Sequence, residues 1–525
     1  MSKGSELSTG EALVGLLEAY GVDTIFGIPG VHNVEMYRAL PRSRIRHILV
    51  RHEQGAGFMA DGYARATGKP GVCFTITGPG LTNILTPLGQ AWSDSSNVLV
   101  ISTALDIADS GQGRGRLHEM IDQRGAAASV TAIHMRAYTP RDLRDAVAKA
   151  FAHFSSRRPR PAYIEIPLDL LKQSAGDGWT ARVLPERAAP SPARVEAAIA
   201  KLRAARSPVL ILGGGALHAG DAAISIAEKL DAPIITTTAG KGAVPAGHSL
   251  CLGYVMGRNE CWDLLAKSDA ILCAGSELSE TDLWNDRMII DHDLIRIDLD
   301  ADTIARPHPA EIAIAADARL TLESIAAGLE RRPVRSQRIL EFGEPDQLRL
   351  MLSRVLQVIR SALPEETVVC SDMTQIAYAA NEVFPVSVPR TWIHPVGFGT
   401  LGFALPAGIG AKFGMGDKPV AVIIGDYGLQ YTVNELGTAA EHNLPLPILL
   451  WNNNALGQIR DDMVSKGIQP NAVTLKNPDF QLLAKAYKCR AERPKSLGNL
   501  ARAIEEALQA DGPTLIEMSP EMVHG

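Results

Sequence analysis

The sequence predicts an α/β fold made of three doubly wound parallel sheets. Short apolar runs, such as those in PVLILGGGA and VAVIIGD, recur along the whole chain and alternate with segments of helical periodicity. Apolar strands separated by helices are typical of parallel sheets that are covered by helices on both faces. Several of these strands end in glycine-rich turns, and ligands of such sheets bind at the strand ends.

The length of the chain requires more than one hydrophobic core. At 525 residues the chain exceeds what a single core supports. Two linkers rich in proline, alanine and arginine, WTARVLPERAAPSPARVE and RRPVRSQR, divide it. We therefore expect three units, at residues 1–175, 190–335 and 345–525, of which the first and third have the same architecture.

Composition and charge narrow the functional class. The chain is 46% hydrophobic and 21% charged, which is typical of a soluble globular protein, and its formal net charge of −6 argues against nucleic-acid binding. No apolar run is long enough to cross a membrane, and the N-terminal segment lacks the apolar core of a signal peptide. The six cysteines are scattered without metal-site spacing, so we expect reduced thiols and a cytoplasmic location.

The most informative stretch is residues 420–457. It is predicted to form an apolar strand from Val420 to Ile424, a Gly-Asp turn, a helix from about Val433 to His442, and a second apolar strand that is followed by three asparagines. Strands joined by a helix in this way lie parallel, so Asp426 and Asn453 should lie at neighbouring strand ends. Carboxylate and amide oxygens suit a hard cation such as Mg2+. The alternative is that the Gly-Asp and Asn-Asn pairs only form turns.

Four motifs, spread over the chain, resemble those of thiamine diphosphate (ThDP) enzymes. They are RHEQGAGFMADGYARATGKPGV, FTITGPGLTN, GFGTLGFALPAGIGA and the interval from GDY to NNN. Their order and spacing are similar to those of the branch that contains acetohydroxyacid synthases and benzoylformate decarboxylases. The resemblance covers essentially the full chain and implies a pyrimidine-binding, a central and a diphosphate-binding domain, in that order.

In this family the motif that begins with Gly-Asp holds Mg2+ and the diphosphate of the cofactor. The resemblance implies that Asp426, Asn453 and the carbonyl group of Ala455 are the metal ligands. It implies cofactor contacts from Gly399, Leu401, Gly425, Asp426, Tyr427, Gly428 and Asn453. The third motif residue is glycine in the family and Tyr427 here, so its backbone N–H faces a phosphate only if its dihedral angles allow.

The catalytic glutamate of the family corresponds to Glu53. That glutamate hydrogen-bonds N1′ of the aminopyrimidine and favours the tautomer that removes the C2 proton. Taken alone, a glutamate at a helix start is usually only a favourable partner of the helix dipole. A bulky apolar residue, here Leu401, holds the cofactor in a V shape. Because family members join the glutamate and the diphosphate site across subunits, the resemblance implies a homodimer or homotetramer.

Residues around the substrate decide among several reactions. Once CO2 has left a 2-oxo acid, protonation gives an aldehyde, attack on a second 2-oxo acid gives an acetohydroxy acid, and oxidation gives an acyl group. Val31 replaces a serine that some decarboxylases carry, and Val31 and His32 are candidate substrate contacts. His118 stands where acetohydroxyacid synthases carry glutamine, and an imidazole can donate a proton near neutral pH. A surface or capping histidine is the alternative interpretation of His118.

Two further candidate substrate residues, Asp461 and Asp462, follow the metal motif in the stretch ALGQIRDDM. Acetohydroxyacid synthases place a tryptophan that selects the second substrate about where Asp462 lies. Two carboxylates at the pocket mouth can pair with a guanidinium group, although a solvated pair at a helix start has the same pattern. The GIPGVHN, GRLHEMIDQ and IRDDM stretches look similar to decarboxylases that act on 5-guanidino-2-oxopentanoate (2-ketoarginine).

Bound FAD is not expected. Flavin-contacting synthases carry a Gly-x-Arg-Phe-Asp-like turn, and the corresponding turn here is the acidic GSELSETDLW. The Gly213–Gly215 run resembles a dinucleotide fingerprint only loosely, and a tight turn between strand and helix explains it better.

The sequence therefore predicts a ThDP- and Mg2+-dependent enzyme that decarboxylates a 2-oxo acid to an aldehyde without oxidation. An acetolactate synthase-type carboligase acting on pyruvate is the alternative. A third hypothesis, a non-catalytic protein with this fold, is disfavoured by the joint presence of Glu53, Asp426 and Asn453. The expected partners are a small 2-oxo acid and further copies of the chain, and neither nucleic acid nor a membrane.

Overall fold

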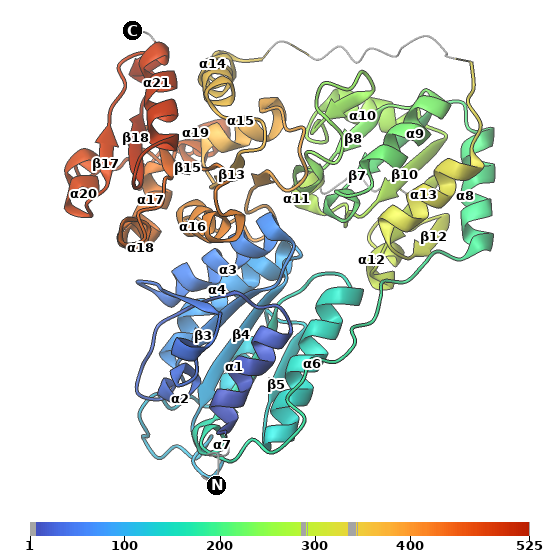
Figure 1. The fold of residues 1–525 in the computed structure, drawn as a ribbon. Helices are drawn as coiled ribbons and strands as arrows, with labels where there is room; N and C mark the ends of the chain where they lie inside the picture. The colour runs from blue at the N-terminus through green and yellow to red at the C-terminus, as the bar shows by residue number, and fades with distance from the viewer. Residues whose placement is uncertain (1–6, 285–289, 291, 334–342, 344, 524–525) are drawn as a thin grey trace.

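The computed structural model describes residues 7–284, 290, 292–333, 343 and 345–523. It contains three sheets of six strands each, and all paired strands run parallel. In Figure 1 the first sheet and its helices lie at the bottom, the second at the upper right and the third at the upper left. The predicted α/β fold with three parallel sheets is confirmed.

The first sheet has the strand order β2-β1-β3-β4-β6-β5. Its strands are β1 (Thr24–Gly27), β2 (Arg46–Leu49), β3 (Gly71–Thr75), β4 (Val98–Ala104), β5 (Ile133–Arg136) and β6 (Ala162–Pro167). The helices of this unit are α1 (Thr9–Ala19), α2 (Val34–Tyr37), η1 (Leu40–Arg42), α3 (Glu53–Thr67), α4 (Pro79–Ser93), α5 (Gln123–Ala128), α6 (Pro140–Ser156) and α7 (Leu168–Leu171). The strand order reverses between β1 and β3, and α3 and α4 begin on either side of this switch point, where such sheets bind ligands.

The third sheet repeats this topology in the order β14-β13-β15-β16-β18-β17. Its strands are β13 (Val368–Ser371), β14 (Trp392–Ile393), β15 (Val420–Gly425), β16 (Pro447–Trp451), β17 (Arg490–Glu492) and β18 (Thr514–Met518). Its helices are α14 (Gln347–Ala362), α15 (Gln375–Val383), α16 (Ala404–Met415), α17 (Asp426–Thr432), η4 (Val433–Glu435), α18 (Leu436–Glu441), α19 (Gly457–Ser465), α20 (Phe480–Ala486), α21 (Leu497–Leu508) and η5 (Pro520–Val523).

The sequence predicted only the second part of the helical segment that follows β15. The helix expected from about Val433 to His442 is present as η4 and α18, but α17 precedes it and begins directly at Asp426, with Gly425 in an extended conformation as its N-cap. An acidic residue in the first turn is favourable next to the positive end of the helix dipole. Asp426 is therefore held at a fixed helix start and not in a flexible turn.

The second sheet has the order β12-β11-β10-β7-β8-β9. Its two central strands are β10 and β7, with two further strands on each side. Its strands are β7 (Pro208–Leu212), β8 (Ile234–Thr236), β9 (Cys251–Gly253), β10 (Ala270–Ala274), β11 (Leu294–Asp298) and β12 (Ile312–Ala315). Its helices are α8 (Pro192–Ala204), η2 (Gly214–Ala216), α9 (Gly220–Leu230), η3 (Thr238–Gly240), α10 (Asn259–Ala266), α11 (Glu280–Leu283), α12 (Ala301–Ala305) and α13 (Ala318–Gly328). A Cβ atom at Gly213 would lie 2.2 Å from the carbonyl oxygen of Gly275, so this glycine permits the ends of β7 and β10 to approach closely.

The acidic turn of the second unit is bound to the first unit. Arg158, in the loop before β6, lies 3.0 Å from a carboxylate oxygen of Glu277 and 3.1 Å from one of Asp298. Both carboxylates belong to strand ends of the second sheet, so these ion pairs fix the orientation of the central unit.

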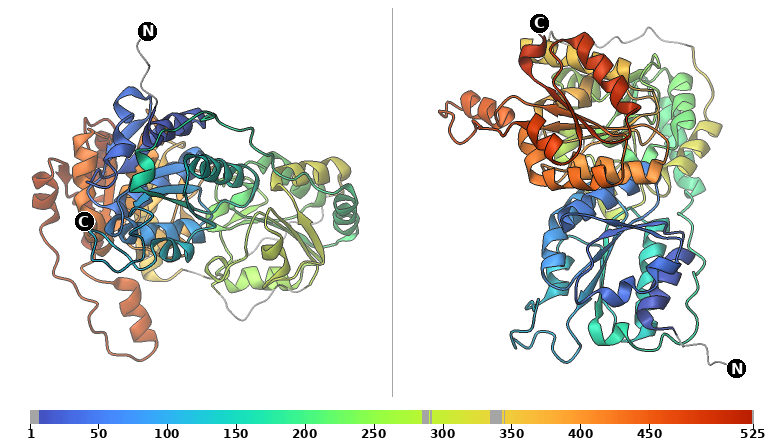
Figure 2. Two further views of the ribbon diagram at one scale, coloured as in Figure 1. Left: turned by 90° about the horizontal axis from the view of Figure 1, so that it is seen from below. Right: turned by 60° about the vertical axis from the view of Figure 1, so that its left-hand side comes forward.

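The first and third units share one continuous hydrophobic core, which contains residues of α3, α4, α16, β13 and β15. Figures 1 and 2 show α16 lying directly on α3 between the two sheets. A Cβ atom at Gly62 would lie 2.1 Å from the carbonyl oxygen of Ala407, and one at Gly410 would lie 1.9 Å from that of Met59. The small residues of the two helices thus let their backbones touch.

No helix in the described part of the chain is both long and apolar enough to cross a membrane. The six cysteines are all described, and all of them are free. Five of the six are buried, which is typical of thiols that only fill a core.

We expect Gly62→Ala to lower the free energy of unfolding by about 1–3 kcal/mol, because the new methyl group overpacks a backbone contact. Gly15→Ala is the matched control, since Gly15 also lies inside a helix, but among the described residues no atom beyond its own helix turn lies within 4 Å of its ideal Cβ position. The Gly15→Ala substitution should raise the free energy of unfolding by about 0.5–1 kcal/mol. Apparent melting temperatures of both variants measure the effect, and equal shifts would contradict the proposed packing.

Candidate active site at the ends of the first and third sheets

The ends of β15 and β16 bring the predicted metal ligands together. Gly425 pairs with Trp451 across the two strands, so Asp426 and the asparagines after Trp451 leave neighbouring strand ends. The carboxylate of Asp426 is buried and accepts hydrogen bonds from the backbone N–H of Tyr427 (3.0 Å) and from the Asn477 amide (2.7 Å). Burial raises the pKa of Asp426 above its usual value. The N–H of Tyr427, which was predicted to face a phosphate only if its dihedral angles allow, thus points at Asp426.

The candidate ligand Asn453 is oriented by two contacts. Its side-chain oxygen accepts a hydrogen bond from the N–H of Ala455 at 3.2 Å, and its amide donates to the Gln375 side chain at 3.1 Å. Ala455 forms an isolated bridge with Thr474, which fixes the backbone at the third candidate ligand.

The oxygens of this edge fit a single hard cation. In the described part of the chain, no lysine or arginine forms an ion pair with Asp426, and no three histidine, cysteine or acidic residues gather into a metal-binding group. A site built here would therefore contain one carboxylate together with amide and carbonyl oxygens. Mg2+ suits such a set, because it is usually bound by one or two carboxylates and completes its shell with water and phosphate oxygens.

Asn477 is a site residue that the sequence reasoning missed. Its amide donates to Asp426 and also to the side-chain oxygens of Asn452 (3.1 Å) and Asn454 (3.2 Å). It lies in the loop between α19 and α20, more than twenty residues beyond the asparagine triplet. No periodicity or motif in that loop marks it, so only the tertiary fold could reveal this contact.

The GFGTLG loop lies against the start of α17. A buried carboxylate, Asp372, accepts hydrogen bonds from the N–H groups of Gly402 (3.0 Å) and Ala404 (3.3 Å), and burial raises its pKa to about 7. A Cβ atom at Gly428 would lie 3.2 Å from this carboxyl group. Asp372 therefore joins the segment carrying the candidate cofactor contact Leu401 to the helix carrying Asp426.

The same loop is held from the first unit. Gln90 of α4 accepts hydrogen bonds from the N–H of Thr400 at 3.2 Å and from its hydroxyl at 2.6 Å. Gly399 has a φ of +64°, a left-handed conformation that favours glycine. Together these contacts set the conformation of the backbone at Gly399 and Leu401, the two predicted pyrimidine contacts.

Glu53 is the first residue of α3 and is 9% exposed. Its carboxylate accepts a hydrogen bond of 2.9 Å from the Asn83 amide on α4. The helix is capped by the side chain of His52, which accepts from the N–H of Gln54 at 3.1 Å. The glutamate is therefore a side chain of fixed position at the switch point of the first sheet.

His32 and His118 form a pair, although they come from loops far apart in the sequence. Their ring centroids are 4.9 Å apart with an edge-to-face arrangement. Within the described residues, Nδ1 of each ring is buried and has no hydrogen-bond partner. Burial, followed by the neighbouring His118, lowers the pKa of His32. Val31, the other predicted substrate contact of this loop, is 69% exposed.

The loop that carries His118 packs against the start of α4. A Cβ atom at Gly78 would lie 2.5 Å from the carbonyl oxygen of His118, and His118 itself has a φ of +63°. Asn83, the partner of Glu53, is on the next turn of the same helix. The histidine pair and the glutamate thus lie near the same end of α4.

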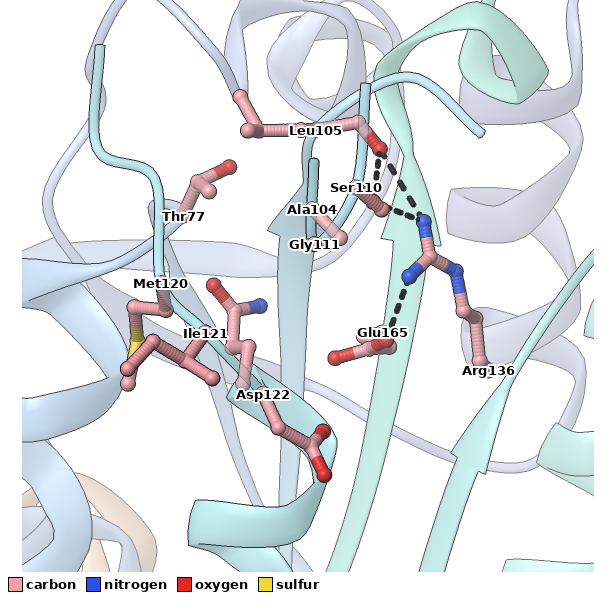
Figure 3. Close-up of a pocket in the computed structure, with 11 residues that line it drawn as sticks. Thr77, Ala104, Leu105, Ser110, Gly111, Met120, Ile121, Asp122, Arg136 and Glu165 are labelled. Carbon is pink, nitrogen blue, oxygen red and sulfur yellow. Dashed lines mark hydrogen bonds and ion pairs between the residues drawn. The ribbon is translucent and has the colours of Figure 1, made fainter. Parts of the chain in front are cut away.

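A cavity of about 150 Å3 lies behind this loop. Figure 3 shows Arg136 at its wall, between Ser110, the carbonyl oxygen of Leu105 and Glu165. Gln123 closes the other side and accepts a 2.8 Å hydrogen bond from the N–H of Gly78. These contacts anchor both ends of the segment that carries His118.

Asp461 and Asp462 do not converge on one point. Asp461 accepts a hydrogen bond of 2.7 Å from Gln375 and forms an ion pair of 3.0 Å with Arg460. Asp462 is exposed and accepts from Gln458 at 3.1 Å. Figure 2 shows that the segment between β16 and α20 extends away from the rest of the molecule. Asp461 is nevertheless linked to Asn453, because both contact Gln375.

Three parallel sheets, strand-end oxygens suited to Mg2+ and a fixed glutamate define a class of cofactor-dependent enzyme. The chain belongs to the thiamine pyrophosphate enzymes. Residues 7–126 match the N-terminal TPP-binding domain of that family, residues 195–325 the central domain, and residues 372–518 the C-terminal TPP-binding domain. It is therefore a ThDP-dependent enzyme, as the motifs predicted.

Comparison with individual proteins shows which members of this family the chain is similar to. The chain is 46% identical to the "Probable 2-ketoarginine decarboxylase AruI" of Pseudomonas aeruginosa, over 98% of this chain and 94% of the relative. It is 31% identical to the acetolactate synthase large subunit of Corynebacterium glutamicum, over 98% and 87% of the two chains. It is 30% identical to the isozyme 3 large subunit of acetolactate synthase from Escherichia coli, over 92% and 88%.

We expect Asn477→Ala to weaken the apparent affinity for Mg2+ by about 10–100-fold, because it removes the side chain that orients the Asp426 carboxylate. Asn471→Ala is the control, since Asn471 is an exposed loop residue whose amide donates to the carbonyl of Gln469 and, within the described part of the chain, to no residue of the metal edge. Half-saturation by Mg2+ at constant ThDP measures the effect. Equal Mg2+ affinity in both variants would exclude a role for Asn477 at the metal.

Proposed function

We propose that this enzyme catalyses the ThDP- and Mg2+-dependent, non-oxidative decarboxylation of a 2-oxo acid to an aldehyde, with 5-guanidino-2-oxopentanoate as substrate. The observation that carries the proposal is the 46% identity, over nearly the full length, to a relative named as a 2-ketoarginine decarboxylase. The acetolactate synthases match over a similar length at about 30% identity. The loop carrying His118, where those synthases are expected to carry glutamine, favours the same assignment.

The chain's own residues divide the work in this proposal. ThDP, when bound, supplies the electron sink for the electron pair that CO2 leaves behind. Asp426, Asn453 and the carbonyl of Ala455 hold Mg2+, and Gly425, Tyr427 and Gly428 surround the diphosphate. Gly399 and Leu401 contact the pyrimidine, and Glu53 holds a proton at its ring nitrogen. A buried carboxylate held by Asn83 is suited to this role.

His118 donates the proton that completes the aldehyde in this proposal, and His32 is its neighbour. Two half-buried imidazoles in edge-to-face contact, whose Nδ1 atoms have no hydrogen-bond partner among the described residues, present ring nitrogens that can hold and deliver a proton. Val31, exposed beside the pair, lines the path of the substrate. Asp461 and Asp462 attract the guanidinium end, and Asp461 is close to the metal edge through Gln375.

Self-association is part of the proposal, as a homodimer or homotetramer with the site at the interface. Large apolar side chains near the predicted site are exposed in the single chain, among them Val31 (69%), Leu117 (60%), Ile121 (98%) and Phe398 (50%). Each of the four lies within three positions of a predicted site residue, and surfaces that other chains cover carry exposed apolar side chains of this kind. The proposed domains are 1–175 for the pyrimidine, 190–335 as the central domain and 345–525 for the diphosphate.

Carboligation of pyruvate to acetolactate is the second candidate function. The 31% identity to an acetolactate synthase over 98% of this chain favours it. The two reactions share every step up to CO2 loss and differ in whether a proton or a second 2-oxo acid reacts next.

A substrate screen with ThDP and Mg2+ tests the proposal. We expect CO2 release from 5-guanidino-2-oxopentanoate at a kcat/KM at least ten times that for pyruvate, benzoylformate or branched-chain 2-oxo acids, with an aldehyde as the product. Acetolactate formed from pyruvate would establish the second candidate instead.

Glu53→Gln tests the role of the glutamate. This variant should lose at least 99% of turnover, within the 10²–10⁴-fold range of acid–base catalysis, while it still binds ThDP. Turnover near that of the wild type would refute the role of Glu53.

A further inference from the structure

Glu435, the last residue of η4, is a fully buried acid that the proposed chemistry does not use. One carboxylate oxygen, Oε1, accepts hydrogen bonds from the backbone N–H groups of Arg51 and His52, each at 3.1 Å. The other, Oε2, accepts from the Thr438 hydroxyl at 2.7 Å. Burial raises the pKa of Glu435 to about 7 despite these hydrogen bonds. A side chain of the third unit thus binds the backbone of the first unit.

The glycine at position 55 gives independent support for this contact. A Cβ atom there would lie 2.3 Å from Oε1 of Glu435, so a side chain at position 55 would push the carboxylate out of its present place. Gly55 lies in the first turn of α3, where a residue with a side chain would be the better helix former. Its presence leaves room for the carboxylate to reach the two N–H groups.

The two N–H groups immediately precede α3, whose first residue is Glu53. N–H groups at a helix start lack partners within the helix and must find them elsewhere. Asn83 fixes the carboxylate end of Glu53, but the described structure holds the backbone before it through Glu435. If that backbone moved, the glutamate side chain would move with it.

We propose that Glu435 is a positioning residue for Glu53: by accepting the N–H groups of residues 51 and 52, it sets where the first turn of α3 stands. The proposal rests on the proposed role of Glu53. A displacement of a catalytic group by about 1 Å can reduce the rate about 100-fold. Glu435 lies in the same continuous stretch as Asp426, since η4 directly follows α17. One short segment therefore carries both the candidate metal ligand Asp426 and Glu435, which contacts the backbone at the start of α3.

Length, and not charge, is the property that this role requires. A carboxylate, a protonated carboxyl and an amide all present one carbonyl-type oxygen to the two N–H groups. Glu435→Gln keeps that oxygen in reach, and its amide nitrogen can donate to Thr438. Glu435→Asp keeps the charge but draws the carboxyl group back by one methylene. The two variants therefore separate reach from charge.

The experiment compares these variants by hydrogen–deuterium exchange and by kinetics. We expect Glu435→Asp to raise amide exchange at least tenfold in the peptide containing residues 50–58, without cofactor, and to lower kcat about 10–100-fold with KM within twofold of the wild type. Glu435→Gln should retain at least a third of kcat and normal exchange. A low kcat in Glu435→Gln together with a kcat near that of the wild type in Glu435→Asp would overturn the proposal. Raised exchange with unchanged kcat would overturn it too.

A matched control is available on the neighbouring helix. Glu441 forms a surface ion pair with the Arg51 side chain, so Glu441→Gln disturbs the same segment without touching its backbone and should leave both readouts unchanged. Exchange is measured without substrate, so it tests the contact even if the wild type decarboxylates no 2-oxo acid. In that case the proposed function fails, while the exchange result still decides the role of Glu435 at the helix start.

Discussion

The close contact between the backbones of α3 and α16 is the constraint on which the site depends. Neither Gly62 nor Gly410 can carry a side chain, because a backbone carbonyl of the facing helix occupies that space. The contact joins the sheet that carries Glu53 to the sheet that carries Asp426 through one apolar core. Glu435 and Gln90 add polar contacts across the same boundary. The contact therefore fixes Glu53 and Asp426 relative to each other within each chain, and in the proposed homodimer it sets where the two interface sites stand.

Much of the fold could be predicted from the sequence, for a simple physical reason. Strands buried on both faces appear as short apolar runs, and the order strand, helix, strand permits only parallel pairing. Strand pairing then placed Asp426 and Asn453 at adjacent ends, as the 27-residue interval suggested. The helical segment from Val433 was predicted, but α17 before it was missed, because Gly425 lets the chain turn directly into a helix at Asp426.

The parts of the site that could not be predicted depend on long-range contacts between loops. Asn477 contacts Asp426 across 51 positions, and His32 meets His118 from a separate strand end. No local pattern encodes such pairs, since each partner alone looks like an ordinary polar loop residue. Asp461 and Asp462 show the reverse case: adjacent in sequence, they find separate partners on a helix whose successive residues point in different directions.

The central claim is that one edge of the third sheet holds the metal and the diphosphate, and that Glu53 meets the other end of the same cofactor. A crystal structure with ThDP and with Mn2+ in place of Mg2+ tests this directly, because anomalous scattering locates the metal. We expect one peak at coordination distance from Asp426, Asn453 and the Ala455 carbonyl, with Glu53 of a neighbouring copy at the pyrimidine. A metal peak elsewhere, or a Glu53 far from any pyrimidine, would contradict it.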